Sequence, residues 1–456
     1  MSILDVFEPI YKLLPEVKSP EVKPTLKRRL MWSALALLLF FIMGNITVYG
    51  IDLSRSLGGN LAAFELILAS KIGSLITVGI GPIVLASIIL QMLVGGKIIN
   101  IDLSNPKDRA RFTSMQKLFG IVLCFFEAFV YSAFGFLVPN SGMLLPVILQ
   151  IAFGAIILIY LDEVVSKYGI GSGIGLFIAG GVAGSIGWRI FAPYLVTNVG
   201  IVEGLLLQIV GEAVKGSLLN AFVLSVPIIF VVIIFLVVVF AEGMHVNIPI
   251  TVGRSGATSR FPVKFLYVSN LPVILAMALY ANLQMWAIAG ANIPILGTML
   301  GAVSYATTIP RVGGTALFEA IFLQGLSGIV IAEILHALLY IAVFVVICVV
   351  FGKFWVEMAG QGPAAISEQL QKAGMSIPGF RKDPRIIRQI LDRYIPPITI
   401  LGSAFVALLA GLADLTGALG SGTGILLTVG IVYRLYEELA REQLMEMHPL
   451  LGRLFK

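Results

Sequence analysis

Long apolar segments alternate with short polar ones along almost the whole chain. A helix needs about 20 apolar residues to cross the ~30 Å hydrocarbon core of a membrane. Ten segments meet this length or come close to it. They are residues 29–50, 73–95, 115–137, 143–161, 172–189, 222–242, 263–288, 328–352, 395–412 and 418–436. The pattern predicts an all-α polytopic membrane protein with ten transmembrane helices.

The composition excludes a soluble protein. Of 456 residues, 58% are hydrophobic and 12% are charged, whereas soluble domains carry about 25% charged residues. No cleavage site of small residues follows the first span, so we expect this span to stay in the protein. The two cysteines lie inside apolar segments and the three histidines are scattered. The sequence therefore predicts no disulfide framework, metal centre or cofactor.

The basic residues predict the orientation of the spans. Lysine and arginine favour the cytoplasmic side of a membrane. With the N-terminus inside, 26 of the 31 Lys and Arg residues fall in cytoplasmic segments and 5 in external ones. This asymmetry predicts that both ends of the chain are cytoplasmic. If a span had been missed, the loops after it would change sides and the asymmetry would be lost.

Ten spans divide into two halves of five, and an odd number of spans gives the halves opposite orientations. Inverted halves are common in transporters, with the working site between them. The predicted parts are a cytoplasmic amphipathic segment 1–28, a first half 29–190, an external linker 191–221, a second half 222–436 with cytoplasmic loops 243–262 and 353–394, and a cytoplasmic tail 437–456.

Residues 60–70, "NLAAFELILAS", are apolar but too short to span the membrane. They form either an external loop on the membrane or a re-entrant segment, which is possible only where protein or water shields its backbone.

Motifs of catalysis are missing from the sequence. It contains neither H-E-x-x-H nor G-x-S-x-G. One Glu-x-x-His pair, Glu333 and His336, has the spacing of di-iron bundles, but those sites need two such pairs, so we expect a structural hydrogen bond. Ionisable residues inside the spans are few, with Glu127 in the third span and Asp414 in a short external turn. A non-enzymatic protein is indicated, and an ion-coupled carrier is disfavoured but not excluded.

A glycine-rich stretch, "KYGIGSGIGLFIAGG" at 167–181, opens the fifth span. It matches neither the P-loop nor the dinucleotide-binding pattern. Glycines at this position let helices approach closely, and they leave Ile174 and Ile178 as the bulky residues of one helical face. The second span repeats this arrangement with Ile80 and Val84, and the tenth span is glycine-rich before Leu427.

These branched residues share a depth in the membrane. Counted from the nearest cytoplasmic charge at 1.5 Å per residue, five residues lie roughly 10–20 Å deep, near the middle of the bilayer. They are Val84, Ile174, Ile178, Ile274 and Leu427. A ring of such residues would form a narrow apolar constriction that blocks ions by dewetting. The alternative is that they face lipid or neighbouring helices, as most apolar residues in spans do.

Four segments resemble the corresponding segments of the SecY family, the large subunits of the Sec protein-conducting channel, in its archaeal form. They are "IGSLITVGIGPIVLASIILQMLVG", "QIAFGAIILIYLDEVVSKYGIGSGIGLFIAGG", "YVSNLPVILAMALYANLQMW" and "GTGILLTVGIVYRLYEELARE". The resemblance extends from about residue 7 to residue 450. It implies a clamshell of two inverted five-helix halves with an hourglass pore between them.

The resemblance also assigns the parts of the pore. The family's plug matches residues 60–70. Its lateral gate, between spans two and three and spans seven and eight, carries a polar cluster that maps to Glu127 and Asn282. A third polar position of the gate is Leu85 here, which departs from the family. The pore ring maps to Ile80, Val84, Ile174, Ile178, Ile274 and Leu427.

Two basic cytoplasmic loops match the family's ribosome-docking loops. Their residues are Arg254, Arg260, Lys264, Arg381, Lys382 and Arg385. The positive-inside rule alone could also explain these charges. The implied partners are small membrane subunits of the SecE/gamma and beta types, the ribosome, signal sequences, nascent polypeptides and membrane lipids, without nucleotide.

We therefore expect the central pore-forming subunit of a Sec translocon in the plasma membrane, which passes unfolded polypeptides outward and releases hydrophobic segments sideways. A secondary transporter of a small solute is the alternative. A scaffold without conduction would leave the glycine-flanked isoleucines unexplained.

Overall fold

A computed structural model represents the whole chain. It describes residues 9, 14–22, 24–52, 70–95, 98–99, 106–133, 137–193, 195–197, 200–252, 257–268, 271–290, 294–313, 315–372, 375–376, 384–419 and 422–447. The chain forms two compact units. The first comprises Met1–Gly184 with Ile431–Lys456, and the second comprises Ser185–Gly430.

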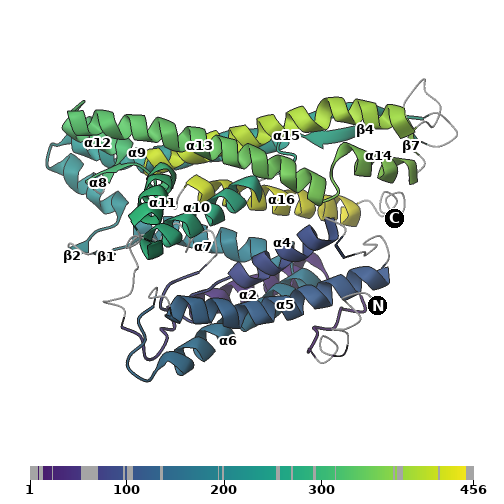
Figure 1. Cartoon of the computed structure of the whole chain (residues 1–456), viewed down its shortest axis with the longest axis horizontal. Helices are drawn as coiled ribbons and strands as arrows, with labels where there is room; N and C mark the ends of the chain where they lie inside the picture. The colour runs from purple at the N-terminus through teal and green to yellow at the C-terminus, as the bar shows by residue number, and fades with distance from the viewer. Residues whose placement is uncertain are drawn as a thin grey trace. The chain divides into compact units, whose positions relative to one another are not determined.

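Each of the ten predicted spans coincides with a helix (Figure 1). The helices are α2 (Leu26–Asn45), α4 (Gly81–Gly95), α5 (Pro106–Ala133), α6 (Leu144–Tyr168), α7 (Gly173–Phe191), α9 (Leu218–Gly243), α10 (Leu271–Gly290), α13 (Gly328–Met358), α15 (Pro384–Leu415) and α16 (Gly422–Met447). By length and composition, α5, α6, α7, α9, α13 and α15 can each cross a membrane. The fold is therefore mostly helical, as predicted.

The second span begins later than its hydropathy predicts. Residues 70–80 form turns, in which Gly73 and Gly79 adopt φ of +83° and +62°, the left-handed region that favours glycine. The helix starts only at Gly81, with Pro82 at its second position, where the missing N–H costs nothing. At 15 residues, α4 is shorter than the ~20 residues that a full crossing needs.

The first unit is built around α6. Its buried cluster joins the start of α4 to α5 and α6, and it consists of Val48, Val78, Ile83, Cys124, Ala128, Leu137, Val147, Ile151, Ala152, Ala155 and Ile159. Gly154 marks the closest approach, since a Cβ there would lie 2.0 Å from the carbonyl oxygen of Leu75. The turns before α4 therefore press directly on the backbone of α6.

The second unit is built around two long helices. The 31-residue α13 and the 32-residue α15 pack side by side, and α10 packs against both (Figure 1). At their centre the rings of Tyr280, Tyr340 and Phe344 are mutually in contact, with centroids 5.5–6.1 Å apart. These three side chains are buried.

Short elements fill the predicted external linker and the loop after α10. They are β1 (Leu195–Thr197), β2 (Gly200–Val202), α8 (Leu205–Val214), α11 (Pro294–Thr307), β5 (Arg311–Val312), β6 (Thr315–Ala316) and α12 (Leu317–Gln324). Near them, His336 Nδ1 lies 3.1 Å from Glu333 Oε2, and Nε2 lies 2.6 Å from the Tyr305 carbonyl oxygen. The Glu-x-x-His pair is therefore the structural contact that we expected.

A small sheet, which the all-α prediction omitted, occupies the predicted cytoplasmic loops. Strand β3 (His245–Val252) pairs antiparallel with β4 (Ala257–Lys264). Strand β7 (Met375–Ser376), which follows α14 (Pro363–Lys372), pairs with the other edge of β3 at Thr251 and Val252. The sheet therefore joins the two loops that the sequence treats as separate. Because β4 runs to Lys264, the seventh span begins at Leu271 rather than at residue 263.

Candidate functional site

The glycine-rich stretch forms the turn between α6 and α7. Helix α6 ends at Tyr168 and α7 begins at Gly173. Between them, Gly171 adopts φ of +67°, which a residue with a side chain rarely adopts. Beside the turn, the Ser172 side chain accepts a hydrogen bond from the Gly175 N–H at 3.2 Å. The stretch therefore ends one helix and caps the next, without the geometry of a phosphate loop.

Each alternating glycine of this turn meets a different neighbour. A Cβ at Gly169 would lie 2.7 Å from Ser33 Oγ of α2, and one at Gly171 would lie 2.6 Å from Leu435 Cδ2 of α16. A Cβ at Gly173 would lie 2.5 Å from the Cα of Asp162 in α6. The prediction that these glycines permit close helix approach is confirmed.

The ring residues of the first unit lie at the starts of α4 and α7. Ile80 is fully buried, and the backbone N–H of Val84 donates to its carbonyl at 3.1 Å. Ile174 is half-buried and packs against the core cluster of the unit, and Ile178 is buried one turn further along α7. In each predicted pair, Ile80 with Val84 and Ile174 with Ile178, the two residues are therefore separated by about one helical turn.

The ring residues of the second unit occupy equivalent places. Ile274 is the fourth residue of α10 and is half-buried. Leu427 is the sixth residue of α16 and is buried. All six ring residues therefore lie within six residues of a helix start or directly before one. Their common level in an assembled pore remains a prediction.

Glu127 lies beside the first residue of α4. It is half-buried on α5, and a Cβ at Gly81 would lie 2.9 Å from its Oε2. The glycine thus leaves room for the carboxyl group at the amino end of α4, where the helix dipole favours negative charge. The second predicted gate residue, Asn282, is in α10, and its side chain lies outside the described part of the structure. Leu85 is an exposed residue of α4.

The predicted docking residues fall on and around the sheet of β3, β4 and β7. Arg260 lies in β4 opposite Pro249 of β3, and Lys264 ends β4 opposite His245. Arg385 is exposed in the first turn of α15. Arg254, Arg381 and Lys382 lie outside the described residues, as does the predicted plug except Ser70.

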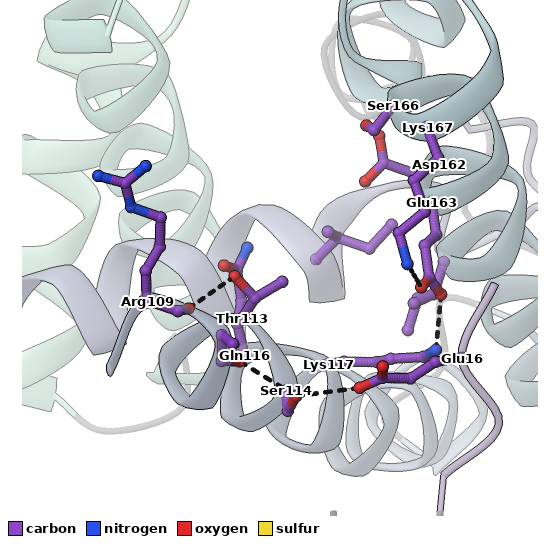
Figure 2. Close-up of a pocket in the computed structure, with 14 residues that line it drawn as sticks. Glu16, Arg109, Thr113, Ser114, Gln116, Lys117, Asp162, Glu163, Ser166 and Lys167 are labelled. Atoms are coloured by element: carbon purple, nitrogen blue, oxygen red, sulfur yellow. Dashed lines mark hydrogen bonds and ion pairs between the residues drawn. The ribbon is translucent and has the colours of Figure 1, made fainter. Parts of the chain in front are cut away.

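Several basic residues make specific contacts in the first unit. From the sequence alone, these residues are interpreted only as determinants of membrane topology. Glu163 accepts hydrogen bonds from Lys117 at 2.7 Å and from Lys167 at 2.8 Å, and from the Val17 N–H at 3.1 Å. Figure 2 shows this group at one side of a cavity of about 470 Å³. The contacts attach the N-terminal segment to α5 and α6.

Arg29, at the start of α2, is also largely buried. Its Nε donates to the carbonyl oxygen of Gly169 at 2.7 Å, and its Nη2 lies 3.4 Å from Glu438 Oε1 of α16. The guanidinium therefore joins α2 and α16 to the glycine-rich turn. No sequence pattern indicates this role, because its partners are 140 and 409 residues away.

Comparison with known proteins identifies the family. The SecY family profile matches residues 74–436. The protein translocase subunit SecY of Methanocaldococcus jannaschii is 47% identical, over 98% of each chain. A solved structure described as a protein conducting channel is 45% identical with a TM-score of 0.77, over 97% of this chain and 98% of that one. Sec61 in a canine ribosome-channel complex is 44% identical with a TM-score of 0.75, over the same shares. This multi-pass membrane chain belongs to the SecY family.

Proposed function

We propose that this chain forms the protein-conducting pore of a Sec translocon. Unfolded secretory polypeptides would cross the membrane through it, and hydrophobic segments would leave it sideways into lipid. The observation that carries the proposal is the placement of six branched apolar residues at the starts of α4, α7, α10 and α16, of which α4, α7 and α16 begin in glycine-rich sequence. Since no nucleotide-binding motif occurs in the sequence, the driving force comes from a partner.

The ring provides a seal that is independent of the sequence of the substrate. Its members are Ile80, Val84, Ile174, Ile178, Ile274 and Leu427. Water leaves a narrow constriction lined only by such side chains, and an ion that entered it would lose its hydration shell. A passing polypeptide meets apolar contacts without directional hydrogen bonds. The ring can therefore close around many sequences.

The plug is the second barrier that we propose. Residues 60–70 match the family's plug in the sequence, and their apolar character suits a segment that rests in an external funnel. Two barriers in series predict that loss of one barrier alone raises the ion conductance less than loss of both.

The lateral gate is assigned to α4, α5, α10 and α13. In the first unit, the room that Gly81 leaves for the Glu127 carboxyl group supports a role for this residue. A carboxyl group facing lipid would be costly, so a position between the halves is favoured. Asn282, which is in α10, is the second residue that we assign to the gate by resemblance to the family.

Changing Glu127 and Asn282 together to Leu is expected to raise the hydrophobicity that a segment needs for lateral exit. Apolar gate faces would stabilise the closed gate, and the threshold should move by about one to two leucines per test segment. Insertion of a graded series of segments measures this threshold. Glu127→Gln with unchanged Asn282 keeps the shape and polarity of the gate and should behave like the parent. An identical threshold in the double Leu variant would reject the gate assignment.

Ribosome docking is assigned to the cytoplasmic sheet. The pairing of β3 with β7 brings the two basic loops to one place, which suits a single docking surface for RNA phosphates. The similarity of this chain to Sec61, whose structure was solved in a ribosome-channel complex, supports this assignment. Small subunits of the SecE/gamma and beta types, signal sequences and nascent polypeptides complete the proposed partners, and the plasma membrane is the proposed location.

A secondary carrier is the rival function. It would require coupled uptake of a solute by the purified chain in vesicles, whereas a pore requires a translocating polypeptide in contact with Ile80 or Ile174. Crosslinking from these two positions therefore tests the proposal directly.

A further inference from the structure

Two aspartates outside the predicted ring hold the starts of α7 and α16. In the first unit, the Ile174 N–H donates to Asp162 Oδ1 at 2.9 Å. In the second unit, the Gly422 N–H donates to Asp414 Oδ1 at 2.8 Å. The first N–H groups of a helix have no acceptor within the helix. Each carboxylate supplies that acceptor from the preceding helix.

The two helix starts are copies of one sequence motif. Residues 171–181 read "GSGIGLFIAGG" and residues 420–430 read "GSGTGILLTVG". When they are aligned without gaps, Gly173 matches Gly422, and the ring residue Ile178 matches Leu427. The aspartates precede these glycines by eleven and eight residues, because Asp162 lies further from the end of α6 than Asp414 lies from the end of α15.

Both matched glycines are packed against the helix that carries the aspartate. A Cβ at Gly173 would lie 2.5 Å from the Cα of Asp162. A Cβ at Gly422 would lie 2.2 Å from the carbonyl oxygen of Ala410 and 2.5 Å from the Cβ of Ala413. Backbone atoms of a packed helix yield little. The first turns of α7 and α16 are therefore fixed by hydrogen bonding and by steric contact at once.

The fixed starts determine the depth of two ring residues. Ile178 and Leu427 each lie five residues beyond the matched glycine, which is about 7.5 Å along the helix axis. In the predicted topology α7 runs outward and α16 runs inward, so the two aspartates would anchor them from opposite faces of the membrane. Sliding of either helix would move its ring residue out of level.

We propose that Asp162 and Asp414 are equivalent positioning residues that set the depth of Ile178 and Leu427, so that the resting ion seal depends on the acceptor oxygen that each side chain supplies. This inference rests on the proposed pore ring. It requires the shape and the acceptor oxygen of aspartate at each position, not its negative charge.

Three double variants separate shape from charge. Each is made in a parent chain that lacks residues 60–70, so that the proposed plug does not mask a leak. Asp162→Asn with Asp414→Asn keeps the acceptor and the length, and should remain as ion-tight as the parent in planar bilayers. Asp→Leu at both positions removes the acceptor, and Asp→Glu adds a methylene where the helices are in contact. Each of these two should raise the resting conductance per inserted channel about tenfold. An unpaired buried N–H in the Leu variant, and an extra methylene in a packed contact in the Glu variant, each shift an equilibrium by about that order. If the Glu variant were tight and the Asn variant leaky, charge would be the cause and the proposal would fail.

A second readout distinguishes positioning from general stability. In the Leu and Glu backgrounds, the thiol reactivity of Ile178→Cys should change relative to the parent, because the residue changes depth. General destabilisation would lower the number of inserted channels, with unchanged conductance per channel and unchanged thiol reactivity, and would overturn the proposal. If the Leu variant does not insert, the comparison of Asn with Glu still decides.

Ring variants separate the failure of this inference from the failure of the pore ring. In the same parent chain without residues 60–70, Ile178→Asn with Leu427→Asn should leak. If these leak while the Asp→Leu and Asp→Glu variants stay tight, the positioning role is wrong and the ring stands. If the Asn ring variant stays tight, the ring assignment is wrong and the positioning role falls with it. Glu333→Leu serves as the matched control and should remain tight, because it removes a carboxyl group that lies away from both repeats.

Discussion

Replacement of Ile80, Ile174 and Ile274 together by asparagine, in a chain that also lacks residues 60–70, is expected to make the resting channel conduct ions. The three amides would hold water in a constriction that is otherwise dry. Loss of only ~1.4 kcal/mol from the barrier to an ion raises its passage tenfold, so we expect at least about a tenfold rise in conductance. Planar bilayer recordings of single inserted channels measure it.

The matched control replaces the same three residues by leucine in the same deletion background. Leucine keeps the ring apolar, so this variant should conduct no more than the chain with the deletion alone. An asparagine variant that remains as tight as the leucine variant would show that these residues do not form the seal.

Reversal of Arg254 and Arg381 to glutamate is expected to weaken ribosome binding and to flatten its dependence on salt. Each lost phosphate contact removes about 0.7–0.9 from the slope of log affinity against log salt, so two contacts remove about 1.5. At low salt the affinity should fall by about tenfold or more, because repulsion from phosphate replaces attraction. Binding to ribosomes across a salt series gives both quantities.

Orientation must be controlled in this experiment, because the same charges can fix topology. Only molecules with cytoplasmic termini, verified by accessibility of the loops, enter the comparison. Lys353→Glu is the control for charge alone, since Lys353 lies near the end of α13 and outside the sheet. Parental affinity and slope in correctly oriented molecules would reject the docking role of the sheet.

The spans could be predicted from the sequence because hydropathy sums over many residues. All ten predicted segments coincide with helices, although errors of up to eleven residues occur at their starts. Gly73 and Gly79 are apolar enough to extend the second segment, yet their left-handed conformations prevent a helix there. Hydropathy measures how strongly side chains prefer an apolar environment, and it carries no information on backbone conformation.

The sheet of β3, β4 and β7 is not among the predicted elements, although its signal is present in the sequence. In β3, Val246, Ile248, Ile250 and Val252 alternate with polar residues or proline, and this period of two is typical of a half-buried strand. A search for helical spans passes over such a segment. Pairing with β7 could not be predicted, because the partners are more than 120 residues apart.

The contacts around the glycine-rich turn were only partly predictable. Close helix approach follows from the glycines themselves, but the neighbours that make them necessary come from α2, α6 and α16. The similarity between residues 171–181 and residues 420–430 can be seen in the sequence alone. The hydrogen bonds from these repeats to Asp162 and Asp414 needed the structure, since the intervening turns differ in length.

The most direct measurement of the central claim places a photo-crosslinking residue at Ile80 or Ile174 and stalls a secretory polypeptide during its translocation. A protein-conducting pore predicts crosslinks from both positions to the stalled chain, and none when the chain is absent. Ile157, which is exposed on α6, is the matched control and should crosslink to lipid but not to the polypeptide. Equal crosslinking from Ile157, or efficient translocation without crosslinks from Ile80 and Ile174, would contradict the account.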